Sequence, residues 1–336
     1  MSTNKYAASH LSTKGPGDAR PTAYDILKDE GLEGKLSDKV FLVTGASAGI
    51  GVETVKILAK TGATVYAAAR DLKKAEKALS GIEGKIELVT LDLASLASVR
   101  KAADDVLKRT GGKLNILVNN AGVMAIASRT LTTDGFEAQF GTNHLGHFLL
   151  FQLLKSALLR SSTPDFQSRV VVLSSSAHRL SSILPDDYNF ENTPYNDFIA
   201  YGQAKTANLY MSNEIERRYG AKGLHSLAVH PGGIMTELTR HLSSDFLENF
   251  SQNKELAANL KSIPQGAATT VLAAIGKEYE GVGGKYLEDA GEWGPVEGDD
   301  SNGLDTKPGH AKWAFDQEKA EQLWKDSCKF VGVQDD

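Results

Sequence analysis

From Asp38 onward the chain alternates short apolar runs with longer amphipathic segments. The apolar runs are rich in β-branched residues and are continuous, which is typical of parallel strands buried on both faces. We expect strands at 40–44, 64–68, 86–91, 114–119, 170–174, 224–230 and 285–287. The longer segments predict helices at 50–61, 72–79, 96–108, 135–159, 200–219 and 266–274.

This alternation predicts an α/β fold with a doubly wound, Rossmann-type parallel sheet in a single domain. We expect residues 37–290 to form that domain, since no internal repeat appears. Residues 1–36 are polar and predict a loosely held arm with a short helix at 21–32. Residues 291–336 predict an acidic loop and a closing helix at 313–330. The inner side of that helix is expected to carry Trp313, Ala320, Leu323 and Trp324, and 288–305 to be a solvated loop.

A glycine-rich turn follows the first strand. Glycine is needed where a backbone turns tightly or approaches phosphate closely, and the helix that follows offers free N–H groups and a positive dipole end. The alternative is an ordinary strand–helix turn. We predict that the turn binds a dinucleotide pyrophosphate through Gly45, Ser47, Ala48, Gly49, Ile50 and Gly51.

The end of the second strand bears on the choice of cofactor. An acidic side chain there would accept hydrogen bonds from the ribose 2′-hydroxyl of NAD. This chain has Arg70, whose guanidinium suits a 2′-phosphate, followed by Asp71. The alternative is that Arg70 is a solvated residue at the start of a helix. We predict NADP(H) as the cofactor.

Tyr201 and Lys205 stand at positions i and i+4 of a predicted helix and therefore share one face. A positive charge at about 4 Å, in an effective dielectric of about 20, lowers a phenol pKa by up to about three units. Such a phenol exchanges protons efficiently near neutral pH. Taken alone, the pair also arises by chance.

Ser174 and Ser175 end a strand 26 residues before Tyr201, and with this addition the pattern resembles the short-chain dehydrogenase/reductase family. The resemblance covers residues 38–287, and within the family it is nearest to retinol-dehydrogenase-like and WW-domain-oxidoreductase-like members. The resemblance to the family also rests on the segments 91–93, 119–122, 141–148 and 231–236.

The resemblance implies four catalytic roles. Tyr201 would be the general acid in reduction and the base in oxidation, and Lys205 would lower its pKa and hold the nicotinamide ribose. Ser175 would hydrogen-bond the substrate oxygen, and Asn143 would position a water. Further cofactor contacts are implied for Asp92, Leu93, Asn120, Ala121, Gly122, Pro231, Gly232 and Thr236.

Two apolar segments are expected to shape a substrate pocket. The first, 178–200, contains Leu184, Tyr188, Phe190, Tyr195 and Phe198. The second lies in a mobile lid at about 233–263 and contains Leu238, Leu242, Phe246, Leu247 and Phe250. Its apolar stripe favours a bulky lipophilic substrate, unless the stripe packs on the core. His178 and His230 are interpreted as structural.

Composition excludes several classes of protein. A net charge of −5 argues against a general nucleic-acid binder. The single cysteine, Cys328, excludes an intrachain disulfide, and no apolar run is long enough to span a bilayer. We therefore expect a cytoplasmic protein, without an intramembrane span or secretory signal. No metal-ligand spacing is present, and the resemblance implies a possible homodimer.

The sequence therefore predicts an NADPH-dependent oxidoreductase that transfers a hydride between a nicotinamide and a lipophilic ketone, aldehyde or secondary alcohol. One alternative is an NAD-linked alcohol dehydrogenase that works oxidatively. Another is a catalytically idle dinucleotide-binding sensor or scaffold.

Overall fold

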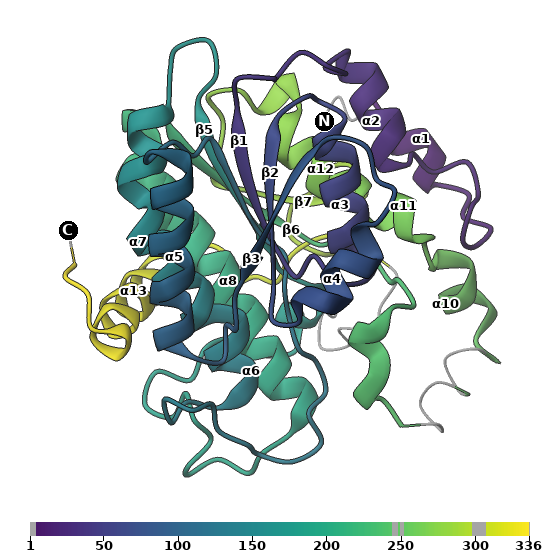
Figure 1. The fold of residues 1–336 in the computed structure, drawn as a ribbon. Helices are drawn as coiled ribbons and strands as arrows, with labels where there is room; N and C mark the ends of the chain where they lie inside the picture. The colour runs from purple at the N-terminus through teal and green to yellow at the C-terminus, as the bar shows by residue number, and fades with distance from the viewer. Residues whose placement is uncertain (1–4, 244–247, 249–251, 298–306, 336) are drawn as a thin grey trace.

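The computed structural model describes residues 5–243, 248, 252–297 and 307–335. In this part of the chain one sheet of eight strands runs through the molecule, in the order β3-β2-β1-β4-β5-β6-β7-β8 (Figure 1). The strands are β1 Val40–Thr44, β2 Thr64–Ala69, β3 Lys85–Thr90, β4 Ile116–Asn119, β5 Ser168–Leu173, β6 Leu224–Val229, β7 Lys285–Glu288 and β8 Gly291–Glu292.

All strand pairs from β3 to β7 are parallel, and only β8 pairs antiparallel, with β7. The predicted doubly wound sheet is thus confirmed, while β8 was not expected. The strand order reverses at β1, which pairs with β2 on one side and β4 on the other. In open α/β sheets such a switch point leaves a cleft beyond the carboxyl ends of the strands.

Helices cover both faces of the sheet, with α5, α7, α8 and α13 on one face and α2, α3 and α12 on the other (Figure 1). The longer helices are α2 Ala23–Glu30, α3 Gly49–Ala59, α4 Leu72–Leu79, α5 Leu96–Thr110, α7 Gly146–Ser161, α8 Asp197–Tyr219, α12 Ala268–Ile275 and α13 Gln317–Val331. The short ones are α1 Ala7–His10, α6 Ala138–Phe140, α10 Lys254–Asn259 and α11 Ile263–Gly266.

Polar caps decide where two helices begin. Asn196 accepts hydrogen bonds from the N–H groups of Phe198 and Ile199, so α8 begins three residues before the expected start at 200. Asp316 accepts from the N–H of Lys319, so α13 begins at Gln317 rather than at 313. Trp313 therefore precedes the helix, which corrects its expected place on the helix.

The helix expected at 135–159 is interrupted, because a π-helical turn, Gly141–Leu145, separates α6 from α7. Next to it, a β-carbon on Gly146 would lie 2.5 Å from the carbonyl oxygen of Leu93, so only glycine allows the backbones to approach this closely. Single π turns inside helices often occur at functional sites. This one contains Asn143.

The helix expected at 21–32 is present as α2, but the expectation that the rest of the arm is loosely held is wrong, since Arg20 is 3% exposed and Gly15 donates its N–H to the carbonyl of Ala258 at 2.8 Å. Ala23, Ile26 and Leu27 of α2 are fully buried in the cluster that includes α3 and α12. A reciprocal capping box between Thr22 and Asp25 fixes the start of α2. The proposed domain boundaries at 36 and 290 stay a prediction.

The expected solvated loop at 288–305 also needs correction. Glu288 ends β7 and is buried, residues 291–292 form β8, and Val296 is 5% exposed. The stretch is therefore partly buried, with Gly309 donating its N–H to the Glu288 carboxylate at 3.1 Å, while Glu292, Gly294, Pro295 and Glu297 are exposed. Residues 298–305 lie outside the described residues.

The C-terminal helix α13 closes the core over α7, as expected from Ala320, Leu323 and Trp324, which are all buried. Trp324 meets Phe148 of α7 edge-on, with ring centroids 4.9 Å apart. Below this pair, His144 Nε2 lies 2.9 Å from Ser327 Oγ. Burial, helped by nearby His147, lowers the pKa of His144 from 6.5 to about 3, so its imidazole is neutral.

This neutral imidazole predicts a pH-dependent stability. The unfolded chain binds a proton at position 144 below pH 6.5 whereas the folded chain does so only near pH 3, so His144 removes stability as pH falls through this interval. At pH 5 we expect the parent to have lost about 2 kcal/mol relative to His144→Gln, which cannot titrate. Urea unfolding of both proteins at pH 7 and pH 5 tests this. Parallel loss in the two proteins would contradict it.

Candidate active site

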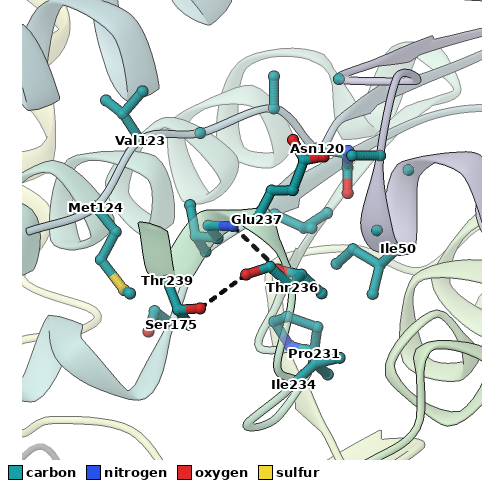
Figure 2. Close-up of a pocket in the computed structure, with 18 of the residues that line it drawn as sticks. Ile50, Asn120, Val123, Met124, Ser175, Pro231, Ile234, Thr236, Glu237 and Thr239 are labelled. Carbon is teal, nitrogen blue, oxygen red and sulfur yellow. Dashed lines mark hydrogen bonds between the residues drawn. The ribbon is translucent and has the colours of Figure 1, made fainter. Parts of the chain in front are cut away.

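A cavity of ≈ 680 Å³ opens at the carboxyl ends of the strands around the β1–β4 switch point. Side chains from several distant segments converge on it (Figure 2). Of the predicted site residues, all but Asn143 line this cavity: Gly45, Ser47, Ala48, Gly49, Ile50, Gly51, Arg70, Asp92, Leu93, Asn120, Ala121, Gly122, Ser175, Tyr201, Lys205, Pro231, Gly232 and Thr236.

The turn after β1 has room only for glycine at two of its positions. A β-carbon on Gly51 would lie 2.2 Å from the carbonyl oxygen of Gly45, and Gly45 itself has a φ of +74°. The helix that follows this turn, α3, starts at Gly49 with Ala48 as N-cap, and no side chain caps it. The first N–H groups of α3 are therefore available for an anion, which fits a pyrophosphate.

The residues after β2 separate the roles of Arg70 and Asp71. Arg70 is exposed and lines the cavity. Asp71 caps α4 by accepting the N–H of Lys74 at 3.0 Å, so its carboxylate has a structural use. The ammonium of Lys74 forms an ion pair with Glu237 beyond β6. The fit to a 2′-phosphate thus depends on Arg70, the exposed cation at the strand end.

The third strand leads into Asp92, which shapes the turn that lines the cavity. Its carboxylate accepts the N–H of Ala94 at 3.0 Å, and its own N–H donates to Ser98 Oγ at 3.0 Å. Leu93 packs against Gly146 at the start of α7. Asp92 and Leu93, both predicted cofactor contacts, therefore stand on a turn fixed by hydrogen bonds.

The hydroxyl of Thr44 joins the ends of β1 and β4. It accepts the N–H groups of Asn120 and Ala121 at 2.9 and 3.0 Å and lies 2.9 Å from His147 Nε2. His147 Nδ1 lies 2.8 Å from the carbonyl oxygen of Asn143, an acceptor only, so Nδ1 carries the proton and Nε2 accepts from Thr44. Burial lowers the pKa of His147 to about 4, which keeps this tautomer neutral.

Asn143 is fully buried behind the cavity wall. Its amide makes two hydrogen bonds to the backbone of Val123, accepting the N–H at 2.8 Å and donating to the carbonyl at 2.9 Å. Asn143 therefore fixes the loop after β4, of which Val123 lines the cavity. Its expected role in positioning a water stays a prediction.

The three consecutive serines, 174–176, all line the cavity, and the second has its hydroxyl near the tyrosine. Ser174 is buried and donates to the carbonyl of Lys205 at 2.9 Å. Ser175 accepts the N–H of Ala177 at 3.2 Å and is also hydrogen-bonded to Tyr201. This arrangement favours Ser175 as the serine that can reach a substrate oxygen.

Tyr201 and Lys205 lie on one face of α8, as expected, with Lys205 Nζ 5.4 Å from the centre of the tyrosine ring. Lys205 donates to the carbonyl of Leu173 at 3.1 Å. Burial raises the pKa of Tyr201 to about 12, although the hydrogen bond with Ser175 opposes this, and burial lowers the pKa of Lys205 to about 8. The expected lowering of the phenol pKa is thus reversed in this structure, because burial disfavours the phenolate.

The residues expected to shape a substrate pocket only partly line the cavity. Of the aromatic and apolar residues chosen in 178–200, only Phe198 lines the cavity; the cavity wall does not include Leu184, Tyr188, Phe190 and Tyr195. Tyr188, for example, stacks on Phe140 with centroids 5.1 Å apart. Leu238 and Leu242 line it, while Phe246, Leu247 and Phe250 lie outside the described residues.

Several residues that line the cavity were not predicted from the sequence. They come from the N-terminal arm, from the loop after β4, from the end of the lid and from the end of β7: Thr13, Arg20, Val123, Met124, Asn259, Lys261, Glu288 and Asp289. Val123 and Met124 directly follow the 119–122 motif and were within reach of sequence reasoning. The polar residues were not, since they are isolated along the chain.

The two histidines interpreted as structural are both neutral. Burial lowers the pKa of each to about 3. His178 places Nδ1 2.6 Å from the carbonyl of Ser175 and accepts the N–H of Ala311 at Nε2, so both of its nitrogens serve the fold. His230 lies in the cavity wall with Nε2 3.8 Å from the Glu288 carboxylate.

Membrane-spanning helices and metal-binding clusters are both absent from the described residues. None of the helices there combines the length and the apolar character needed to cross a bilayer. Nor does any group of three or more His, Cys, Asp or Glu side chains there have the arrangement of a metal site.

Residues 39–246 match the family described as short chain dehydrogenase. The chain is 50% identical over 331 residues to the short-chain dehydrogenase/reductase prx1 of Penicillium rubens, which covers 98% of this chain and 95% of that protein. It is 38% identical to retinol dehydrogenase 12 of Mus musculus over 89% of this chain and 88% of that protein. The WW domain-containing oxidoreductase of Danio rerio is 41% identical over 80% of this chain and 65% of that protein.

Two solved structures share the fold. A protein of Mycobacterium paratuberculosis superimposes with a TM-score of 0.67 at 34% identity, over 91% of this chain and 97% of that one. Pseudomonas aeruginosa RhlG, in an NADP active-site complex, gives a TM-score of 0.62 at 25% identity over 76% of this chain and 96% of that one.

The Thr44 network predicts a large difference between two similar substitutions. Thr44→Val keeps the shape of the side chain but leaves the Ala121 N–H and one imidazole nitrogen without their Thr44 partner, while the Asn120 N–H keeps only the carbonyl of Val118 at 3.0 Å; we expect this to cost about 2–4 kcal/mol. Thr44→Ser keeps the hydroxyl and loses one methyl group, which costs about 1 kcal/mol. Urea unfolding at pH 7 measures both. Similar losses for valine and serine would show that the hydroxyl is unimportant.

Proposed function

The chain belongs to the short-chain dehydrogenase/reductase family, and we propose that it is an NADPH-dependent oxidoreductase of lipophilic ketones, aldehydes or secondary alcohols. The observation that carries this proposal is the meeting of Ser175, Tyr201 and Lys205 in one cavity with a glycine-only turn. An anion-binding turn and a protonated phenol in the same cavity suit hydride transfer coupled to proton transfer. A cytoplasmic location and a homodimer stay predictions.

The residues of the cavity fit a dinucleotide. The uncapped start of α3 and the turn at Gly45–Gly51 would hold the pyrophosphate, and Asp92 and Leu93 would contact the adenine. Pro231, Gly232 and Thr236 would lie at the nicotinamide, with Thr236 against Gly49 of the turn. When bound, the nicotinamide supplies or accepts the hydride.

The chain itself supplies the proton and stabilises the charge that develops on oxygen. Since its pKa is raised to about 12, the Tyr201 phenol is protonated at neutral pH and can donate to a carbonyl oxygen during reduction. Ser175 would donate a second hydrogen bond to the same oxygen. Lys205, with a pKa of about 8, is largely cationic at neutral pH and would favour the phenolate that remains.

The proposed preference for NADPH rests on Arg70. It is the exposed cation at the end of β2, and Asp71, the neighbouring acid, is engaged as the cap of α4. RhlG, a relative of the same fold, is described with NADP in its active site. An NAD-linked oxidative enzyme would instead be favoured by an acidic side chain free to bind the ribose.

The role of Tyr201 predicts that Tyr201→Phe keeps cofactor binding and loses at least about 99% of turnover, because the proton donor is removed. Tyr210→Phe on the same helix is a matched control, since the Tyr210 hydroxyl donates only to the backbone of Trp313 at 2.8 Å. Initial rates with a panel of aromatic ketones measure the difference. Turnover of Tyr201→Phe within a factor of ten of the parent would exclude the role.

The role of Arg70 predicts that Arg70→Ala weakens NADPH binding about tenfold and leaves NADH binding within twofold, since only NADPH has the 2′-phosphate. Lys73→Ala, an exposed cation on α4 that is not part of the cavity wall, should change neither affinity. Fluorescence titration of both cofactors tests this. An unchanged ratio of NADPH to NADH affinity would refute the assignment, and binding of neither cofactor by the parent would favour the idle-scaffold alternative.

A further inference from the structure

The N-terminal arm lies against the part of the chain that closes the substrate side of the cavity. The segment around Gly15 runs along α10, a helix of the region expected to form the lid (Figure 1). Gly15 donates its N–H to the carbonyl of Ala258 at 2.8 Å, and Thr13 donates its hydroxyl to the side chain of Asn259 at 3.2 Å. Thr13 and Asn259 both line the cavity.

The central residue of this contact is Arg20, which is 3% exposed. Its guanidinium donates to the carbonyls of Asn259 at 2.8 Å and Leu260 at 2.6 Å, the last residue and the C-cap of α10. It also donates to the carbonyl of Gly15 at 3.2 Å. Carbonyls at the end of a helix lack donors within the helix, so Arg20 supplies those that α10 does not have.

Asp18 and Gln265 hold Arg20 and its neighbours in place through further hydrogen bonds. Asp18 accepts from Arg20 Nε at 2.8 Å; burial disfavours the Asp18 carboxylate, but its hydrogen bonds to Arg20 and to the backbone hold its pKa at about 2. Gln265 of α11 donates to the carbonyls of Asp18 and Arg20 at 3.1 and 3.2 Å and accepts the N–H of Gly17 at 2.9 Å. The arm is thereby held to α11, in the body of the protein.

Besides Arg20, Gly15 and Thr13 also hydrogen-bond the arm to α10. None of the residues in α10 is buried. A helix of six residues is unstable by itself, and without a buried face it depends on its caps. Asn253 caps its N-terminus, and Arg20 binds its C-terminal end.

A second connection leads from the arm to the segment proposed to bind the nicotinamide. His10 of α1 lies 3.2 Å from the Asp289 carboxylate, which pairs with Lys261 Nζ at 2.7 Å. Lys261 donates its backbone N–H to Gly233 at 2.8 Å, and its side chain passes so close to Gly232 that a β-carbon there would lie 2.8 Å away. Residue 261 directly follows the carbonyls that Arg20 holds.

We propose that Arg20 is a positioning residue for substrate recognition, through which the N-terminal arm holds α10 and Lys261 as the wall of the substrate pocket. The proposal rests on the proposed function for the meaning of that pocket. Arg20 itself acts through α10, because its donors are directed to backbone carbonyls and to Asp18. Its loss should therefore change the affinity for the substrate far more than the chemical step.

The variants Arg20→Ala and Arg20→Lys test this, with Arg169→Ala as a matched control. Arg169 is also buried, pairs with a carboxylate, Glu280, and donates to carbonyls at the end of a helix, those of Ala274 and Gly276. It lies near the amino end of β5, away from the cavity wall. The control thus removes the same kind of interaction, with its cost in stability, at the amino ends of the strands, opposite the end where the cavity opens.

For Arg20→Ala we expect KM for the best ketone of a panel to rise about tenfold while kcat and the NADPH affinity stay within about twofold. Amide hydrogen exchange in 254–261 should accelerate about tenfold or more, with exchange in β1 and β4 unchanged. Arg20→Lys, which keeps one cationic donor, should restore part of both effects. Arg169→Ala should lower the melting temperature without changing KM or exchange in 254–261.

An unchanged KM in Arg20→Ala, or an equal rise in Arg169→Ala, would overturn the proposal, and so would unchanged exchange in 254–261. Hydrogen exchange needs no substrate, so it separates this proposal from the proposed function. If the parent turned over no carbonyl compound, the proposed function would fail, and the role of Arg20 in substrate recognition would fail with it. Faster exchange in Arg20→Ala would then still show that the arm orders α10.

Discussion

At the point where the strand order reverses, one hydroxyl makes three hydrogen bonds of 2.9–3.0 Å and also lies 3.4 Å from the carbonyl of Val118. Thr44 Oγ1 accepts two N–H groups from the loop after β4 and donates to His147, which in turn donates to the carbonyl of Asn143. The glycine turn, the 119–122 motif and the π turn are thereby fixed to one another. A hydroxyl that both donates and accepts is required, because two backbone donors and one imidazole acceptor meet there.

Burial sets the protonation of Tyr201, Lys205 and three histidines in and around this site. It raises the pKa of Tyr201 and lowers that of Lys205, and it keeps His147, His178 and His230 neutral. The proton of Tyr201 is held where the proposed reduction needs it, and Lys205 is the cation placed beside it.

The strands and the motif residues were predictable because their signals are local. The run 40–44 is continuous and apolar, and Gly51 and Tyr201 stand in short patterns with a chemical reason. The π turn was not predictable, since a one-residue change of helical phase at Gly141–Leu145 leaves no mark in a periodicity. Nor was the burial of Ile26, because it depends on α12, which lies far along the chain. Arg20 and Lys261 could not be assigned either, because apart from Asp18 the partners of Arg20 are mainly carbonyls of α10, and Lys261 pairs with Asp289, all far along the chain from Arg20 or from each other.

The long sequence separation between the arm and its partners has a consequence for the order of folding. Arg20 and the carbonyl of Leu260 that it binds are 240 residues apart, and α2 packs on α12, which ends at Ile275. At about 5–20 residues per second, a ribosome needs on the order of ten to fifty seconds to make the chain between them. During synthesis the first four strands, with the glycine turn, are therefore complete well before α10 and α12 are made. For that time the arm has α3 to pack on but lacks α12 and the carbonyls that Arg20 binds, so the substrate wall forms late in synthesis.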